Sequence, residues 1–157
     1  MLRVGDPAPD FDLPDAGMEM VRLADLRGKQ NVVLYFYPKD DTPACTMEAI
    51  NFGDLESEFA RYQTVVYGIS RDDCICHAAF RDKHGLTVQL LSDDDGNVCQ
   101  SYDVLEEREK DGVKKLCVHR CTVVIDRQGV VRHIMRNINP KAHAKEVLTL
   151  MKDLRSL

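Results

Sequence analysis

Cysteine is the residue type through which this chain is most able to do chemistry, and Cys45 has the most suggestive position. It follows a strongly apolar run at residues 31–37 and precedes a segment, residues 46–62, whose apolar side chains recur at helical spacing. A thiol at the start of a helix lies near unsatisfied N–H groups and the positive end of the helix dipole. Both favour the thiolate, which is the nucleophilic form. We therefore expect Cys45 to be reactive.

The turn before Cys45 contains residues suited to supporting that chemistry. Pro38 and Pro43 stiffen it, and Pro38 ends the preceding strand without an N–H that needs a partner. Thr42 lies three residues before Cys45. In a tight turn its hydroxyl could donate to the sulfur or to an oxygen of a substrate.

The composition limits the remaining function classes. With 157 residues the chain fits one domain, and a net charge of −5 argues against general nucleic-acid binding. The first seven residues lack the basic start and apolar run of a signal peptide, so we expect none, and no apolar stretch approaches the length needed to span a membrane. From these features we expect a cytoplasmic protein that binds no membrane. We also expect its cysteines to be reduced, because disulfide scaffolds belong mainly to short secreted domains.

The elements that position Cys45 can be read from apolar periodicity and turn residues. A small hairpin or pair of edge strands, then one helical turn, is expected at residues 10–29. Strands are expected at 31–37, 64–70 and 88–91, and a late hairpin at 116–125 and 130–135. Helices are expected at 46–62, from the capping residues 70–73 to 84, at 98–102 and at 141–154, and an exposed loop at 106–115.

Strands that alternate with helices predict a parallel sheet, to which the late hairpin adds antiparallel strands. This is the element order of a thioredoxin-like α/β fold. We expect one domain over residues 1–157, with a central mixed sheet flanked by helices and an N-terminal β-hairpin extension.

The turn also carries a resemblance. Pro38, Thr42 and Cys45 match the pattern P-x-x-x-T-x-x-C of peroxiredoxins of the AhpC/TSA type. The chain resembles the bacterioferritin comigratory protein, or peroxiredoxin Q, subfamily along nearly its whole length. The supporting residues are 4–11, 35–43, Thr46, Glu48, 67–70, 90–93, Arg120, Thr122 and Asp126.

The resemblance implies a thiol-dependent peroxidase that reduces hydrogen peroxide and organic hydroperoxides. Cys45 would attack the peroxide and become a sulfenic acid. Thr42 would bind the substrate oxygens, and Arg120 would hold the thiolate and stabilise developing charge. Pro38 would shield the site from water, and Glu48 would fix Arg120.

The sequence offers two candidates for the cysteine that resolves the sulfenic acid. Many members of the subfamily place it five residues after the first cysteine, where this chain has Ile50, and others place it on the next helix, which here carries Cys74 and Cys76. We favour Cys76 as the more accessible thiol and keep Cys74 as the alternative. Thioredoxin or a glutaredoxin-like reductant would then open the disulfide. If neither cysteine serves, the protein is a one-cysteine enzyme resolved by an external thiol.

Other potential ligands have simpler interpretations. Cys99, Cys117 and Cys121 are expected in the core, the last two on the side of one strand opposite Arg120. The histidines 119, 133 and 143 are expected on the surface or flanking helices, and the acidic residues 93–95 in a solvated turn. Cys74, Cys76, His77 and His84 lack the paired spacing of zinc sites. We expect no metal and no cofactor.

Two rival functions remain. The first is a thioredoxin-like thiol-disulfide oxidoreductase, because Cys45 stands where such a protein has the second cysteine of C-x-x-C. Thr42 stands in place of the first cysteine, so the chain could not complete dithiol exchange there by itself. The second rival is a non-catalytic protein that kept the fold. Subfamily resemblance implies a monomer, with a dimer as the alternative.

Overall fold

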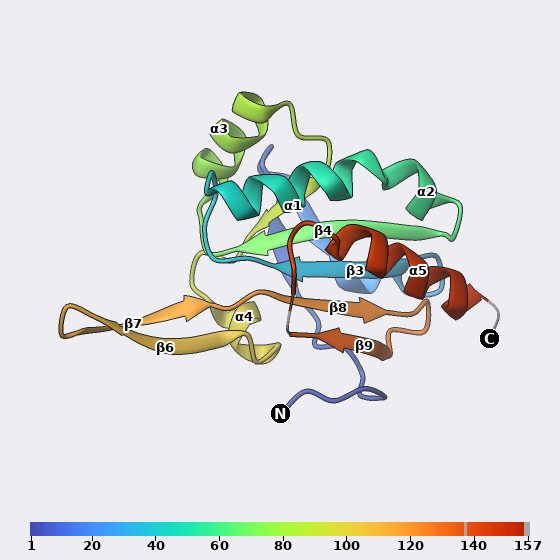
Figure 1. The fold of residues 1–157 in the computed structure, drawn as a ribbon. Coiled ribbons are helices and arrows are strands. Elements are labelled where there is room, and N and C mark those ends of the chain that lie inside the picture. Colours follow the sequence, from blue (N-terminus) through green and yellow to red (C-terminus); the bar gives the residue numbers. More distant parts are fainter. Residues whose placement is uncertain (137, 156–157) are drawn as a thin grey trace.

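The computed structural model describes residues 1–136 and 138–155, and its centre is a five-stranded mixed sheet with the strand order β5-β4-β3-β8-β9 (Figure 1). β3 (Asn31–Phe36), β4 (Thr64–Ser70) and β5 (Gln89–Ser92) run parallel. β8 (Cys121–Ile125) pairs antiparallel with β3 and with β9 (Val131–Met135). The thioredoxin-like mixed sheet expected from the sequence is therefore confirmed.

Alternating side chains of β3 divide the core into two halves. Val32, Leu34 and Phe36 face a cluster that includes residues of the N-terminal extension, while Val33 and Tyr35 face a cluster that includes Cys45. Every residue from 32 to 37 is at most 1% exposed. Such a run, apolar on both faces, is what a strand covered on both sides requires.

Helices cover both faces of the sheet (Figure 1). α1 (Pro43–Asp54), α2 (Glu56–Ala60), α3 (Cys74–His84) and α5 (His143–Arg155) lie on the side of Cys45. The other side carries α4 (Asn97–Ser101), the hairpin of β1 (Asp12–Pro14) and β2 (Met20–Arg22), and the 3-10 turn η1 (Leu23–Leu26). The N-terminal hairpin extension predicted from the sequence is thus present.

The helix predicted over residues 46–62 differs from the observed one in two ways. It begins earlier, at Pro43, because proline suits the first helical position, where no N–H partner is needed. It also breaks at Leu55, which separates α1 from α2. Gly53 and Asp54, both poor helix formers, precede this break.

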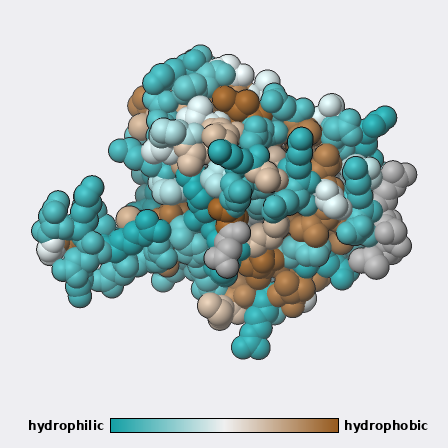
Figure 2. All heavy atoms as spheres, viewed as in Figure 1, coloured by the Kyte–Doolittle hydropathy of each residue, from teal (hydrophilic) through white to brown (hydrophobic). Residues whose placement is uncertain are grey.

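The exposed loop predicted over residues 106–115 is wrong. β6 (Leu105–Lys110) and β7 (Val113–Val118) form a two-stranded antiparallel hairpin that projects from the body (Figure 1). Asp111 and Gly112 form its turn with positive φ values of 54° and 78°, as two-residue hairpin turns require. Figure 2 shows this arm covered by hydrophilic side chains. High charge alone therefore did not indicate a loop.

Candidate active site

Cys45 is the third residue of α1 and is only 1% exposed. Thr42 is the N-cap residue, with extended backbone angles, and Pro43 begins the helix. The turn that leads from β3 to α1 therefore places the sulfur in the first helical turn, as expected. Because the sulfur is buried, a substrate can reach it only by passing between the side chains that surround it.

Arg120 joins the sulfur to a buried carboxylate. One guanidinium nitrogen, Nη2, lies 3.0 Å from Cys45 Sγ, and the other, Nη1, donates to Glu48 Oε2 at 3.2 Å. The structure thus brings Arg120 to Cys45 and Glu48 of α1, which lie 75 and 72 positions before it in the sequence, as the resemblance implied. A single cation faces two groups that can each carry negative charge.

Glu48 is fully buried, and its second oxygen, Oε1, has no hydrogen-bond partner among the described residues. Burial raises the pKa of Glu48 to about 7, and the charge and hydrogen bond of Arg120 oppose this rise. Glu48 therefore changes charge near neutral pH. Its ionised form draws Arg120 toward α1, next to the sulfur.

An open groove of about 890 Å³ leads to Arg120. Pro38 is exposed at its wall, and the other lining residues are Glu106, Arg108, Val118, His119, Arg136, Ile138 and Asn139. Sequence reasoning missed most of this groove because its residues come from the β6–β7 hairpin and from the segment after β9. His119, predicted at the surface, lines the groove, and its Nδ1 lies 3.2 Å from the carbonyl oxygen of Arg120.

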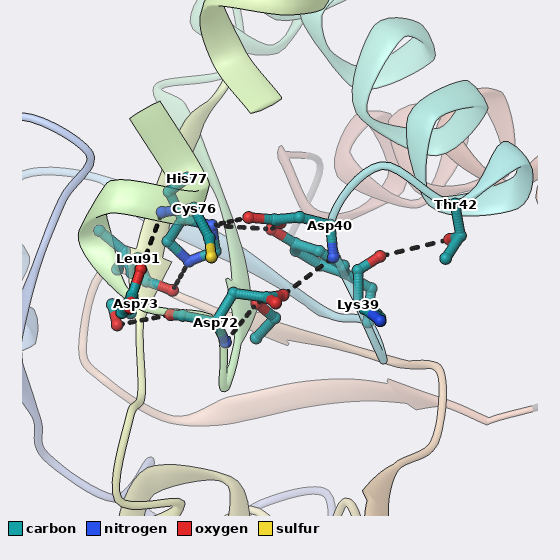
Figure 3. A network of polar contacts seen from close by, with 11 residues as sticks. Lys39, Asp40, Thr42, Asp72, Asp73, Cys76, His77 and Leu91 are labelled. Atoms are coloured by element: carbon teal, nitrogen blue, oxygen red, sulfur yellow. Dashed lines mark hydrogen bonds and ion pairs between the residues drawn. The ribbon is translucent and has the colours of Figure 1, made fainter. Parts of the chain in front are cut away.

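Thr42 is not turned toward the sulfur in this structure. Its hydroxyl donates to the carbonyl of Lys39 at 3.2 Å (Figure 3). The side chain remains partly exposed. A substrate that offers a better acceptor than a backbone carbonyl could take over this hydrogen bond.

The two cysteines of α3 differ in surroundings. Cys76 is exposed and Cys74 is half-buried, which agrees with the predicted accessibility of Cys76. A hydrogen bond with the Asp73 carboxylate raises the pKa of Cys76, and the charges of Asp72 and Asp40 add to the effect. Burial raises the pKa of Cys74, which lines a separate groove beside β1. All six cysteines are free thiols.

Sequence reasoning also missed a buried pair beside the turn. Asp40 Oδ2 lies 2.7 Å from His77 Nδ1, and His77 is fully buried (Figure 3). Tyr37 donates its hydroxyl to Asp40 Oδ1 at 2.6 Å. The only signal for this pair was the position of His77 on the helix, three residues before the buried Phe80.

Four smaller predictions need correction. Cys117 was predicted in the core, but it is half-buried on β7. It was also predicted on the same strand as Cys121, but β7 ends at Val118 and Cys121 begins β8. Asp93 is fully buried rather than solvated, and its carboxylate accepts the N–H of Cys99 at 2.7 Å. Cys99 and Cys121 are buried, as predicted.

His143 is the fourth correction: it lies at the start of α5, as expected for a helix-flanking residue, but it is fully buried rather than on the surface. Its Nε2 lies 2.6 Å from the hydroxyl of Thr122, and burial lowers its pKa to about 4. A neutral imidazole therefore joins the start of α5 to β8.

A search of residues 1–136 and 138–155 finds no group of three or more His, Cys, Asp or Glu that could hold a metal ion. Within the same part of the chain, none of the helices combines the length and apolar character needed to cross a membrane.

Comparison with known proteins shows the family to which the chain belongs. The model of the AhpC/TSA family matches residues 4–134. A putative peroxiredoxin Bcp of Coxiella burnetii is 42% identical, covering 94% of this chain and 97% of the relative. Peroxiredoxin Bcp of Bacillus subtilis is 37% identical, covering 98% of this chain and 97% of the relative.

Solved structures of similar sequence have the same fold. The bacterioferritin comigratory protein of Xanthomonas campestris superposes with a TM-score of 0.89 at 32% identity and covers 99% of this chain and 98% of its own. The peroxidoxin BcpB of Mycobacterium tuberculosis gives 0.87 at 35% identity, with 98% and 99% covered. Fold, site and relatives together define a thiol-dependent peroxidase of thioredoxin-like architecture. The chain belongs to the AhpC/TSA family of peroxiredoxins.

Proposed function

We propose that Cys45 is the peroxidatic nucleophile and that the enzyme reduces hydrogen peroxide and organic hydroperoxides. The observation that carries this proposal is the 3.0 Å contact between Cys45 Sγ and the guanidinium of Arg120. The sulfur attacks one peroxide oxygen, the O–O bond breaks, and water or an alcohol leaves. Cys45 becomes a sulfenic acid, two electrons more oxidised than the thiol.

Arg120 has a double role in this mechanism. Its positive charge stabilises the thiolate before the attack and the negative charge that develops on the breaking O–O bond. The ion pair with Glu48, at 3.2 Å, keeps the guanidinium in one orientation. Because both partners are largely removed from water, the orientation is held more firmly than by a surface pair.

Thr42 and Pro38 complete the proposed substrate site. We propose that the Thr42 hydroxyl leaves the Lys39 carbonyl and donates to a peroxide oxygen when substrate binds. Pro38, at the groove wall, would limit the water that reaches the O–O bond. The volume of the groove, about 890 Å³, leaves room for the organic part of an alkyl hydroperoxide. The Xanthomonas campestris relative is described as having alkyl peroxide reduction activity.

Resolution is proposed to use Cys76. The exposure of the Cys76 thiol supports this choice, and so do the charges of Asp72 and Asp40 that act on it, since Asp40 belongs to the turn before Cys45. Cys74 instead lines the groove beside β1. The Cys76 thiol would displace the oxygen of the Cys45 sulfenic acid, giving a disulfide and water. Thioredoxin or a glutaredoxin-like reductant would restore both thiols.

The cellular setting is part of the same proposal. Turnover requires Cys45 and Cys76 to return to the reduced form, which fits the cytoplasm. One chain supplies the sulfur, the guanidinium and the carboxylate, so we propose a monomer as the working unit, with a dimer as the alternative.

The test is peroxide consumption by the reduced protein. Cys45→Ser should abolish it, while Cys117→Ser, which removes a half-buried thiol on the projecting hairpin, should leave it intact. If Cys45→Ser retained the wild-type rate, the proposed nucleophile would be wrong. Insulin reduction without peroxide consumption would instead favour the thiol-disulfide oxidoreductase. A wild-type protein that turns over but forms no internal disulfide would be the one-cysteine enzyme.

A further inference from the structure

Two consecutive aspartates attach the turn before Cys45 to α3. Asp40 contacts His77 at 2.7 Å, and its own N–H donates to Asp72 Oδ2 at 2.9 Å (Figure 3). Asp41 accepts from Lys83 Nζ at 2.6 Å and lies 2.7 Å from His84 Nε2. We call these contacts the clamp; it consists of Asp40 and Asp41 on the turn and of Asp72, His77, Lys83 and His84 in and just before α3.

The inner part of the clamp is fully enclosed. His77 Nε2 lies 3.0 Å from the carbonyl oxygen of Leu91, which can only accept, so this nitrogen carries a proton. A further proton lies between His77 Nδ1 and Asp40 Oδ2. Because His77 is fully buried, separating it from Asp40 without water would leave polar groups unpaired. The inner contact is therefore the stronger part.

The outer part of the clamp is exposed and weaker. The Asp41 side chain is 41% exposed and that of Lys83 is 61% exposed. Lys83 and His84 lower the pKa of Asp41 through their hydrogen bonds, so its carboxylate is ionised at neutral pH. Asp41 has a positive φ of 61°, a conformation that asparagine also tolerates. This permits a nearly isosteric substitution.

The clamp joins the two segments that must approach each other during resolution. On the turn, Thr42 directly follows Asp41, and Cys45 comes three residues after Thr42. On α3, Cys76 directly precedes His77. Cys45 is buried and Cys76 is exposed, so their sulfur atoms do not meet in this conformation. A disulfide requires the first turn of α1 or of α3 to move, and such movement breaks the contacts of the clamp.

We propose that the clamp holds the turn in its peroxide-reactive position and sets the rate at which oxidised Cys45 reaches Cys76. This inference rests on the proposed two-cysteine mechanism. In the step concerned, the S–O bond of the sulfenic acid breaks, the S–S bond forms, and the hydroxyl group leaves with the thiol proton as water. The clamp residues are positioning residues, since none of them touches the reacting sulfur atoms.

A weaker clamp has two measurable consequences. It increases the population of open conformers and so accelerates disulfide formation, while oxidation of Cys45 by peroxide stays at the wild-type rate as long as the closed form predominates. The clamp contacts belong to the dithiol form. Loosening them therefore stabilises the disulfide relative to the dithiol and makes its reduction potential more negative.

The first test uses surface variants, which should all fold. Reduced protein is mixed with one equivalent of hydrogen peroxide and quenched with an alkylating reagent, and mass spectrometry follows sulfenic acid and disulfide over time. Lys83→Gln should accelerate disulfide formation roughly two- to fivefold, the effect of an exposed ion pair. Lys83→Arg should restore the wild-type rate. Asp82→Asn is the matched control, because among the described residues Asp82 pairs only with its neighbour Arg81 on the same helix.

The second test addresses coupling and the buried contact. Asp41→Asn should accelerate the step as Lys83→Gln does, and the double variant should add little to either. Asp40→Asn, which removes the carboxylate from the buried contact with His77, should accelerate it roughly tenfold or more. The reduction potential of the disulfide should become more negative in each clamp variant and should not change in Asp82→Asn.

The outcomes separate the clamp from the mechanism on which it rests. Oxidation of wild-type Cys45 without any disulfide to Cys76 would overturn two-cysteine resolution, and the clamp with it. A normal wild-type disulfide whose rate and potential are the same in Lys83→Gln and Asp41→Asn would overturn the clamp alone.

Discussion

At the scale of single residues, Arg120 determines how the site is organised. It donates to the thiol sulfur and to a buried carboxylate at similar distances, 3.0 and 3.2 Å. A planar guanidinium can serve two acceptors at once in a fixed geometry, which a lysine ammonium cannot. The charge state of Glu48 therefore affects how the guanidinium of Arg120 is oriented toward Cys45.

The raised pKa of Glu48 predicts a pH-dependent contribution to stability. Folding shifts this pKa from 4.5 to about 7, so the folded state binds a proton more tightly than the unfolded state. The contribution is present below pH 4.5 and is lost as the pH rises to about 7, by about 3 kcal/mol. Wild type should lose stability relative to Glu48→Gln across this range, as measured by urea unfolding at several pH values.

The comparison of wild type with Glu48→Gln contains its own control. His143, whose pKa is lowered to about 4, makes stability rise with pH between 4 and 6.5, but it is present in both proteins and cancels in the difference. A difference in stability that stayed constant from pH 4.5 to 7 would show that Glu48 does not titrate in this range.

At the scale of elements, α3 combines a capping residue with the thiol that we propose for resolution. Asp73 caps the helix by accepting the N–H of Cys76 at 2.8 Å, and this hydrogen bond lowers the pKa of Asp73. The same carboxylate raises the pKa of the Cys76 thiol. In the closed form the cap therefore keeps Cys76 protonated and slow to react with other electrophiles.

This arrangement predicts the effect of Asp73→Asn. Asparagine still caps the helix but carries no charge, so the pKa of Cys76 should fall. The rate of Cys76 alkylation by iodoacetamide, followed between pH 7 and 10 in a Cys74→Ser background, should have its midpoint at a lower pH in the Asp73→Asn protein. Identical midpoints would mean that the carboxylate does not act on the thiol.

Elements with local signals were predictable from the sequence, and those without were not. α3 was placed correctly because Asp73 and Gly85, the latter with a φ of 62°, mark its two ends. The β6–β7 hairpin was missed because its charges suggested a loop, although Asp111 and Gly112 carried a hairpin signal.

The residues of the site also differ in whether the sequence could predict them. Cys45 was singled out by its position between a strand and a helix, whereas Arg120 and Glu48 were named through a family resemblance. The structure brings Arg120 into contact with both of the others. The pairs of Asp40 with His77 and of Thr122 with His143 join residues 37 and 21 positions apart. Nothing local marks such pairs, because only the packing of helices on the sheet brings their members together.

At the scale of the whole molecule, the sheet has to be tightly packed on the side that carries Cys45. Tyr35 stacks on Phe52 of α1, with a centroid distance of 4.6 Å, and its ring also lies over Gly68 of the neighbouring strand. A Cβ atom at Gly68 would lie 2.5 Å from Tyr35 Cζ. The glycine thus makes room for the ring that supports α1.

This packing predicts that Gly68→Ala destabilises the whole fold. Overpacking should cost about 1 to 3 kcal/mol. The melting temperature should fall by about 2 to 4 °C for each kcal/mol in a domain of this size. Gly17→Ala is the control, because a Cβ there meets no atom closer than 3.4 Å. Equal melting temperatures for the two variants would contradict the packing argument.

The central claim is that buried Cys45 is oxidised by peroxide and then resolved by Cys76 on α3. Its most direct test is mass mapping of the reduced protein after one equivalent of hydrogen peroxide. We predict a disulfide between Cys45 and Cys76 in wild type and in Cys74→Ser, and an unresolved sulfenic or sulfinic Cys45 in Cys76→Ser. A disulfide between Cys45 and Cys74, or an oxidised Cys45 that stays unpaired in wild type, would contradict the account.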